Sequence, residues 1–233
     1  MPKVTSKGKL IVIDGTDGSG KATQTELLMK RLKKEKIPAR KLDFPRYEEN
    51  FFGKLIGSCL AGDYGDFASL DPHIASSLYA FDRFETRPLI ESFLTRGYTV
   101  VLDRYVSSNQ IHQGGKIADP KARKKFLSWL DTLEFGVLAL PRPDAILYLD
   151  VPLSVSQKLL ASKGQKEKKV YLKGKKKDVV ESSQKYLSDS RESALRLVKR
   201  QNHWIRVECI KKGVLLSRET IAEKVWNRVK EII

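Results

Sequence analysis

The sequence predicts an α/β protein in which a parallel sheet carries helices on both faces. Short apolar runs alternate along the chain with longer segments of helical periodicity, as repeated βαβ units require. A glycine-rich segment at residues 15–23 lies between the first apolar run and the first helical segment. The chain has 233 residues, 41% of them apolar, which is enough to bury one core. We therefore expect a single domain over residues 1–233.

Five apolar runs predict the strands of the sheet. Each run is short and nearly continuous, which is typical of strands buried on both faces. The runs are 10–13, 39–44, 99–102, 145–149 and, least clearly, 204–209. Because parallel neighbours are joined by right-handed crossovers, each connection needs a helix between its two strands. The expected sheet is therefore five-stranded and parallel.

Segments with apolar residues every three or four positions predict the helices. Pro38 follows the end of the first, Gly97 is suited to end the second, and Ser217 is suited to begin the last. The predicted helices are 21–36, 71–96, 120–133, 179–202 and one that begins near 217.

Residues 15–23 read Gly-Thr-Asp-Gly-Ser-Gly-Lys-Ala-Thr and predict a phosphate-binding loop. The glycines let backbone N–H groups turn toward phosphate oxygens, and the helix that begins near Lys21 adds the positive end of its dipole. Lys21 then reaches the outer phosphates. With a strand before it and a helix after it, the loop indicates the three-layer fold of the P-loop NTPases. The residues predicted to hold the nucleotide are Gly15, Thr16, Asp17, Gly18, Ser19, Gly20, Lys21, Ala22 and Thr23.

One position in this loop departs from the usual pattern. The residue after the lysine is normally Ser or Thr, whose hydroxyl binds Mg²⁺. Here it is Ala22, and Thr23 follows. We expect Mg²⁺ to depend on carboxylates, water and phosphates, or on compensation by Thr23.

Charged residues follow two of the predicted strands at their carboxyl ends, where parallel sheets bind ligands. Asp103 is placed like the acidic group that binds Mg²⁺ directly or through water. Arg46 and Arg104 are suited to bidentate contacts with phosphate. Tyr79 and Arg83 are four residues apart in a predicted helix, so one face carries both a ring that can stack on a base and a guanidinium.

The net charge of +16 and a pI of about 9.7 favour anionic partners. A lysine-rich segment at residues 158–178 carries much of this charge, and we expect it to be mobile. Nucleic-acid binding stays a minor alternative. No apolar run approaches the roughly 20 residues of a membrane span. Two distant cysteines and three scattered histidines show no metal-ligand spacing and suggest a reducing compartment, the cytoplasm.

Taken together, these motifs resemble the thymidylate kinase family over nearly the whole chain. The resemblance implies ATP-dependent phosphorylation of dTMP to dTDP, with ATP as donor, Mg²⁺ as cofactor and a homodimeric assembly. It is carried by residues 15–23, Phe44-Pro45-Arg46, 78–83, Asp103-Arg104-Tyr105, 140–144 and 149–152.

The resemblance also implies residue roles. Asp17 would face the deoxyribose 3′-hydroxyl and the metal region, and Tyr79 would stack on thymine. Arg83 would hydrogen-bond a thymine carbonyl, while Arg46 and Arg104 would grip the dTMP phosphate.

Further members of the implied substrate and metal sites are polar or lie in turns. Asp103 would hold Mg²⁺ through water, with Asp17 nearby. The nucleoside pocket would be completed by Phe44, Pro45, Ser108, Asn109 and Gln113.

The chain departs from the family in one catalytic group. Family members place an arginine near the transferred phosphoryl group, either in the phosphate loop or in the lid. Here the loop has none, and residues 156–184 contain only lysines as cations. With the lid assigned to about 158–178, Lys163 matches the arginine position best. We expect Lys163 or a neighbouring lysine to act with Lys21, Arg104 and Asp17, although lysine lacks the bidentate fork.

Two other classes of function remain open at this point. One is another nucleotide or deoxynucleoside kinase of the same fold, which a panel of acceptors would reveal. The other is a nucleic-acid-binding NTPase, whose ATP hydrolysis would be stimulated by nucleic acid and would depend steeply on salt. The alanine at position 22 and the missing arginine also leave open a protein that binds nucleotide without turnover.

Overall fold

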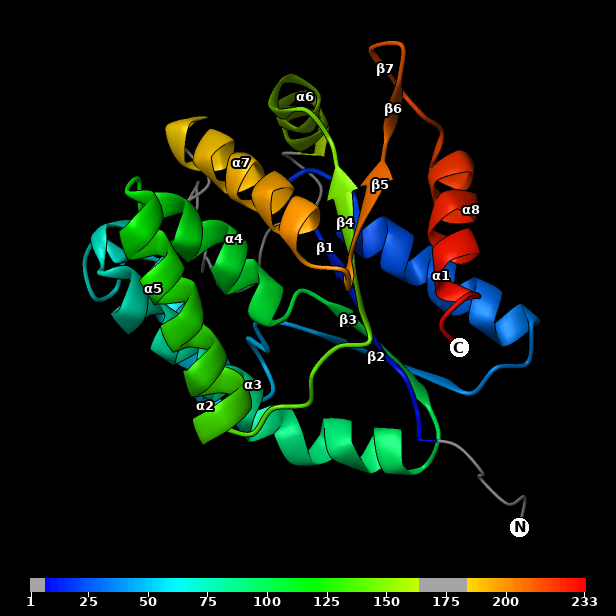
Figure 1. Ribbon diagram of the computed structural model, residues 1–233, viewed down its shortest axis with the longest axis horizontal. Helices are drawn as coiled ribbons and strands as arrows, with labels where there is room; N and C mark the ends of the chain where they lie inside the picture. The colour runs from blue at the N-terminus through cyan, green and yellow to red at the C-terminus, as the bar shows by residue number, and fades with distance from the viewer. Residues whose placement is uncertain (1–6, 164–183) are drawn as a thin grey trace.

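The computed structural model describes residues 7–163 and 184–233. A five-stranded sheet runs through the middle of this part of the chain in the order β2-β3-β1-β4-β5 (Figure 1). All neighbouring strands pair in parallel, so the five predicted strands and their arrangement are confirmed. Their bounds are β1 (Leu10–Asp14), β2 (Ala39–Asp43), β3 (Thr99–Asp103), β4 (Ala145–Asp150) and β5 (Trp204–Glu208).

Helices cover both faces of the sheet. On one face lie α1 (Lys21–Lys34) and α8 (Arg218–Val229), which Figure 1 shows side by side. On the other face lie helices from the connections between β2 and β3, between β3 and β4, and between β4 and β5. They are α3 (Pro72–Thr95), α4 (Val106–Lys116), α5 (Pro120–Asp131) and α7 (Gln184–Arg200).

The central strand β1 divides its side chains between two cores. Leu10 and Val12 pack with α3, α4, α5 and α7, whereas Ile11 and Ile13 pack with α1 and α8. Because successive side chains of a strand point to opposite faces, a strand covered on both sides is apolar throughout. This burial explains why β1 reads as a continuous apolar run.

The register of the sheet sets the position of the site. Asp103 at the end of β3 pairs with Ile13 of β1 on one side and with Asp43 of β2 on the other. The loops that leave these three strands therefore open at one level. This edge brings the phosphate loop, the Phe44-Pro45 turn and Arg104 together.

Several elements were absent from the sequence prediction. They are α2 (Phe51–Leu60), α4, α6 (Leu153–Lys163), a one-turn 3₁₀ helix (Phe67–Ser69), a π-helix (Thr132–Val137) that continues α5, and a hairpin of β6 (Ile210–Lys211) and β7 (Val214–Leu215). Helix α4 was missed because its buried residues include Ser107, Asn109, Gln110 and Gln113, which hide the usual apolar periodicity.

The predicted lid begins inside a helix rather than in an irregular segment. Residues 158–163 belong to α6, whose pattern of apolar residues includes Leu159 and Leu160. The remainder of the predicted lid, residues 164–178, lies outside the described residues. Of the described helices, none has the length and apolar content needed to cross a bilayer.

Candidate active site

The phosphate loop joins β1 to α1 and supplies one wall of a cavity of about 520 Å³. Gly18 and Gly20 have φ angles of 79° and 89°, in the left-handed region that glycine adopts without strain. A Cβ at Gly18 would also lie 2.4 Å from the carbonyl oxygen of Ser156. Gly20 caps α1 with no side-chain hydrogen bond, so the first N–H groups of the helix are left for an anion.

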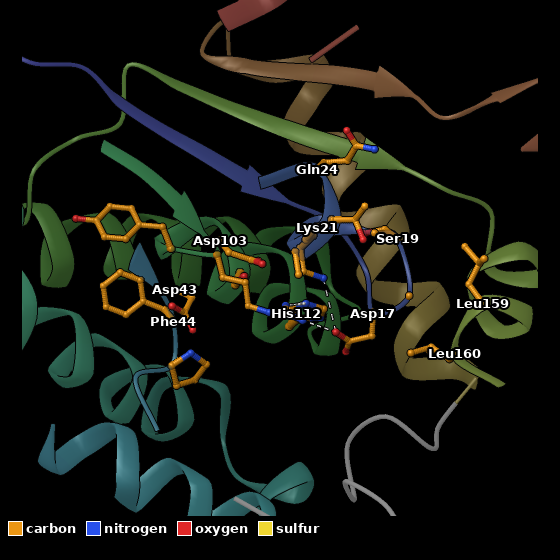
Figure 2. Close-up of a pocket in the computed structure, with 18 of the residues that line it drawn as sticks. Asp17, Ser19, Lys21, Gln24, Asp43, Phe44, Asp103, His112, Leu159 and Leu160 are labelled. Carbon is orange, nitrogen blue, oxygen red and sulfur yellow. Dashed lines mark hydrogen bonds and ion pairs between the residues drawn. The ribbon is translucent and has the colours of Figure 1, made fainter. Parts of the chain in front are cut away.

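Lys21 lies at the centre of the cavity. Its Nζ donates hydrogen bonds to the carbonyl oxygens of Gly15 at 2.9 Å and Thr16 at 3.1 Å. It also lies 3.7 Å from the Asp17 carboxylate, which it faces in Figure 2. Burial and the nearby charge of Arg104 lower the pKa of Lys21. The lysine is thus held by its own loop with its charge directed into the space where phosphates would bind.

Arg104 forms an ion pair with Asp17 across the same space. Its backbone has a φ of 68°, an uncommon conformation for a residue other than glycine and one that concentrates at functional sites. The preceding residue, Asp103, lines the cavity, and burial raises the pKa of its carboxyl although Lys21 and Arg104 oppose the shift. The structure therefore brings three predicted site residues together, with Lys21 and Arg104 both beside the carboxylate of Asp17.

The last residue of β1 ties the phosphate loop to α4. The buried carboxylate of Asp14 accepts hydrogen bonds from the hydroxyls of Ser107 at 2.6 Å and Ser108 at 2.9 Å, and from the backbone N–H of Gly15. Ser108, predicted to line the nucleoside pocket, does line the cavity but donates its hydroxyl hydrogen bond to Asp14.

One end of the cavity has an aromatic and amide lining. The bordering residues there are five that the family resemblance implied for the substrate site, namely Phe44, Pro45, Tyr79, Asn109 and Gln113. Within the described residues, the Oε1 of Gln113 is buried and has no hydrogen-bond partner. A buried amide oxygen normally has a hydrogen-bond partner, so this oxygen has accepting capacity left for a ligand.

Arg83 lines this end but already has a protein partner. It forms a fork with Glu134, with Nε to Oε2 and Nη2 to Oε1 both at 2.6 Å, and both side chains are almost fully buried. Asn109 also donates to Glu134. The sequence reasoning named Arg83, which borders the cavity, but missed Glu134, which comes from the π-helix 51 positions away. Only one terminal nitrogen of Arg83, Nη1, lies outside the fork, 3.5 Å from the carbonyl oxygen of Tyr105.

The other end of the cavity contains residues that the sequence reasoning missed. The chain from the end of β7 into α8 lines this end with Leu215, Leu216, Arg218 and Ile221. Helix α6 adds Leu159 and Leu160 (Figure 2). Gln24 donates its Nε2 to the carbonyl oxygen of Arg218 at 3.1 Å, and its buried Oε1 has no partner in the described part of the chain. These residues carry no motif. Only the position of Gln24, directly after the phosphate loop, could have indicated it.

Three predicted nucleotide or substrate residues do not border the cavity. Gly15 and Thr16 form the back of the phosphate loop, and Arg46 lies beside the bordering residues Pro45 and Tyr47. The side chain of Lys163 lies outside the described residues. Tyr105, the third residue of the Asp-Arg-Tyr motif, is fully buried and donates its hydroxyl to the carbonyl oxygen of Pro141 at 3.1 Å, so it supports the wall of the site.

The carboxylates present fit a magnesium ion that is held largely by phosphates and water. No cluster of three potential metal ligands occurs in residues 7–163 and 184–233. Asp103 lines the cavity near Lys21, whereas Asp17 is engaged by Arg104. One carboxylate beside a phosphate loop suits Mg²⁺, which keeps several waters and binds through one or two carboxylates plus phosphates.

Asp82 holds the turn that carries Arg46. Its buried carboxylate lies 3.3 Å from the backbone nitrogen of Arg46 through both oxygens, and burial raises the pKa of Asp82 to about 6. The folded protein thus binds this proton at a higher pH than the unfolded chain does. Stability from this group is present below the unfolded pKa of 3.8 and is lost as the pH rises through about 6.

Asp82→Asn is therefore expected to become progressively more stable than the wild type between pH 4 and pH 8, by up to about 3 kcal/mol. Urea unfolding at several pH values measures this difference. Asp71→Asn is the matched control, because Asp71 is exposed and its pKa is lowered by hydrogen bonds from His73. Parallel pH profiles for wild type and Asp82→Asn would show that Asp82 does not titrate in this range.

Comparison with known proteins places this site in a described family. A family model described as "Thymidylate kinase" matches residues 13–221. A thymidylate kinase from Mycobacterium tuberculosis is 33% identical over 159 residues, covering 68% of this chain and 73% of the relative. A thymidylate kinase from Plasmodium falciparum is 30% identical over 171 residues, covering 71% and 75%. The solved thymidylate kinase from Candida albicans superposes with a TM-score of 0.71 at 23% identity, covering 98% and 93%, and shares the fold.

Proposed function

This chain belongs to the thymidylate kinase family, and we propose that it transfers the γ-phosphoryl group of ATP to the phosphate of dTMP, giving dTDP and ADP. The observation that carries this proposal is the convergence of Lys21, Arg104 and Asp17 in the middle of one cavity. Tyr79 and Arg83 line the end suited to a base, and Gln24 and Arg218 line the opposite end. Two nucleotides can thus meet with their phosphates at the central cations.

The reaction needs positioning and charge neutralisation more than it needs a base. An oxygen of the dTMP phosphate is already an anion and attacks the γ-phosphorus in line with the leaving ADP oxygen. Lys21 would neutralise charge on the donor phosphates from its place on the loop. Arg104 would exchange Asp17 for the acceptor phosphate and hold it near the attacking position.

Magnesium fits the same account. We propose that Asp103 holds Mg²⁺ through water, with Asp17 nearby, because both carboxylates border the cavity next to Lys21. When bound, Mg²⁺ supplies positive charge to the donor phosphates. Ala22 offers no hydroxyl to the metal. Among the described side chains, Mg²⁺ would therefore be held by the carboxylates of Asp103 and Asp17, unless the hydroxyl of Thr23 takes part.

The nucleoside roles follow from the lining of the cavity. We propose that Tyr79 stacks on thymine and that Asn109 and Gln113 bind polar groups of the nucleoside. The fork with Glu134 fixes the plane of the Arg83 guanidinium and leaves Nη1 as its terminal donor toward thymine. Arg46 would reach the acceptor phosphate only after the turn that follows β2 adjusts around a ligand.

We further propose a lid over residues 158–178, with Lys163 supplying the positive charge that the family draws from an arginine. Lys163→Ala should lower kcat by about one to three orders of magnitude, since cations at the transferred phosphoryl group act mainly in the transition state. Steady-state kinetics with saturating ATP measures the effect. Lys121→Ala, on the exposed first turn of α5, is the control. An unchanged kcat in Lys163→Ala would contradict the assignment of this charge to Lys163.

The assembly and location remain proposals. We propose a homodimer, supported by large apolar side chains exposed on α2 and α3, namely Phe51, Ile74, Phe84 and Leu89. We propose a cytoplasmic location, supported by two cysteines that are buried and free.

A further inference from the structure

His112 is a buried histidine at the wall of the catalytic cavity. It lies on α4, only 8% of its surface is exposed, and it borders the same space as Lys21 and Asp17 (Figure 2). Its ring stacks on Tyr186 of α7, with centroids 5.7 Å apart and planes 10° apart. No metal cluster in the described residues includes it. The mechanism outlined above does not use it.

A chain of hydrogen bonds fixes which nitrogen of His112 carries the proton. Arg104 can only donate, so its Nη1, 3.3 Å away, requires a bare Nε2 on His112. The Nδ1 must then carry the hydrogen and donate to the Ser190 hydroxyl at 3.1 Å. Ser190 donates in turn to the carbonyl oxygen of Tyr186 at 2.7 Å. In this chain neutral His112 and Ser190 each donate one hydrogen and accept one, and the chain runs from Arg104 to the backbone of α7.

The surroundings favour the neutral imidazole that this chain requires. Burial and the charge of Arg104 lower the pKa of His112 to about 4, with Lys21 acting in the same direction. Asp17 and Asp14 oppose the shift. At neutral pH the ring is therefore an acceptor toward Arg104 and does not add a further positive charge.

The guanidinium of Arg104 has a different partner on each terminal nitrogen. Nη2 pairs with Asp17, and Nη1 donates to His112. If Asp17 gives way to the acceptor phosphate, His112 still holds Nη1 and the guanidinium keeps its plane. Without this second anchor, the arginine is free to turn both nitrogens toward Asp17, because bidentate pairing with a carboxylate is favourable.

We propose that His112 is a positioning residue that orients Arg104 toward the acceptor phosphate. This role rests on the proposed function, because it concerns the arginine that would bind that phosphate. His112 itself need not touch the transferred group.

Two substitutions distinguish the role of the hydrogen-bond acceptor on His112 from the role of its aromatic ring. His112→Phe keeps an aromatic ring against Tyr186 but removes the acceptor. His112→Gln loses the ring but retains an oxygen that can accept from Arg104. Loss of a hydrogen bond to a charged group should lower kcat/KM for dTMP by about 10- to 100-fold in His112→Phe. The KM for ATP should stay within about twofold, and His112→Gln should recover most of the loss.

His73→Phe is the matched control. His73 also packs its ring against aromatic residues, Phe126 and Trp129, but does so outside the cavity. This substitution is expected to leave both kinetic constants unchanged. Thermal unfolding of all three variants identifies any loss that comes from misfolding.

A second measurement does not depend on turnover. Long-range ¹H–¹⁵N correlation of the histidine side chains, with the His112 signals identified from their absence in His112→Phe, reports the tautomer. A protonated Nδ1 and a bare Nε2 in the free enzyme are expected. A protonated Nε2 would overturn the proposal, because that nitrogen could not accept from Arg104.

The kinetic outcomes are equally decisive. Equal losses in His112→Phe and His112→Gln would assign His112 a role in shape only, and no loss in His112→Phe would remove its role altogether. Either result would leave the proposed function standing if the wild type phosphorylates dTMP. A wild type that ignores dTMP would instead overturn the proposed function, while the tautomer would still decide whether His112 holds Arg104.

Discussion

Arg104→Ala is expected to lower kcat for dTMP phosphorylation by about two to three orders of magnitude. Arg104 is the cation that can change partners between Asp17 and a substrate phosphate, and such a contact strengthens as charge develops in the transition state. Its left-handed backbone conformation, directly after β3, holds it at the mouth of the phosphate loop. Rapid-quench or coupled steady-state assays measure the change in kcat.

Two further variants show whether the loss in Arg104→Ala comes from the charge, from the bidentate geometry or from the removal of any arginine. Arg104→Lys keeps the charge but not the fork, so its kcat should fall between those of wild type and Arg104→Ala. Arg87→Ala is the control, since Arg87 is partly buried and pairs with Glu91 and the carbonyl oxygen of Leu138, away from the cavity. A rise in KM for dTMP with kcat unchanged would show that Arg104 only binds the ground state.

Arg83→Met is expected to destabilise the fold by about 3–5 kcal/mol. It removes one partner of a buried ion pair and leaves the carboxylate of Glu134 without a counter-charge. Burial already raises the pKa of Glu134, and the loss of Arg83 raises it further. The stability of this variant should therefore fall as the pH rises, because the buried carboxyl is tolerated best when protonated. Urea unfolding at pH 5 and pH 8 measures both effects.

The chain supplies a matched control for this pair. Arg142 and Asp131 form a similar fork, with both N–O distances at 2.8 Å, but both side chains are largely exposed. Arg142→Met should lower the free energy of unfolding by less than about 1 kcal/mol. The larger loss expected in Arg83→Met would then come from the burial of its ion pair. The double variant Arg83→Met/Glu134→Leu should recover part of the stability lost in Arg83→Met. A loss in Arg83→Met no larger than that in Arg142→Met would contradict the account.

The sheet and the phosphate loop could be predicted because local physics determines them. β1 is buried on both faces and reads as an apolar run, and the glycine spacing after it has few uses other than a phosphate loop. The carboxyl-end rule then placed Asp103 and Arg104 beside Lys21. Tyr79, Asn109 and Gln113, which the family resemblance implied for the nucleoside site, border the cavity.

The remaining features depend on contacts between distant segments. Glu134 lies in a π-helix without any pattern that links it to Arg83. His112 stands four residues after Ser108 on α4, so a helical reading of that segment would have placed both on one face, but its buried polar residues concealed the helix. Arg46 is a different case. It follows β2 as the sequence indicated, and Asp82 holds its backbone nitrogen, but Arg46 is not among the residues that border the cavity.

The most direct test of the central claim is the acceptor preference of the purified enzyme. The measurement is kcat/KM with ATP for dTMP, dCMP, UMP and thymidine, together with ATP hydrolysis with and without added nucleic acid. The account predicts that dTMP is the preferred acceptor and that nucleic acid leaves ATP hydrolysis unchanged. A preference for dCMP, UMP or thymidine, or hydrolysis stimulated by nucleic acid, would contradict it.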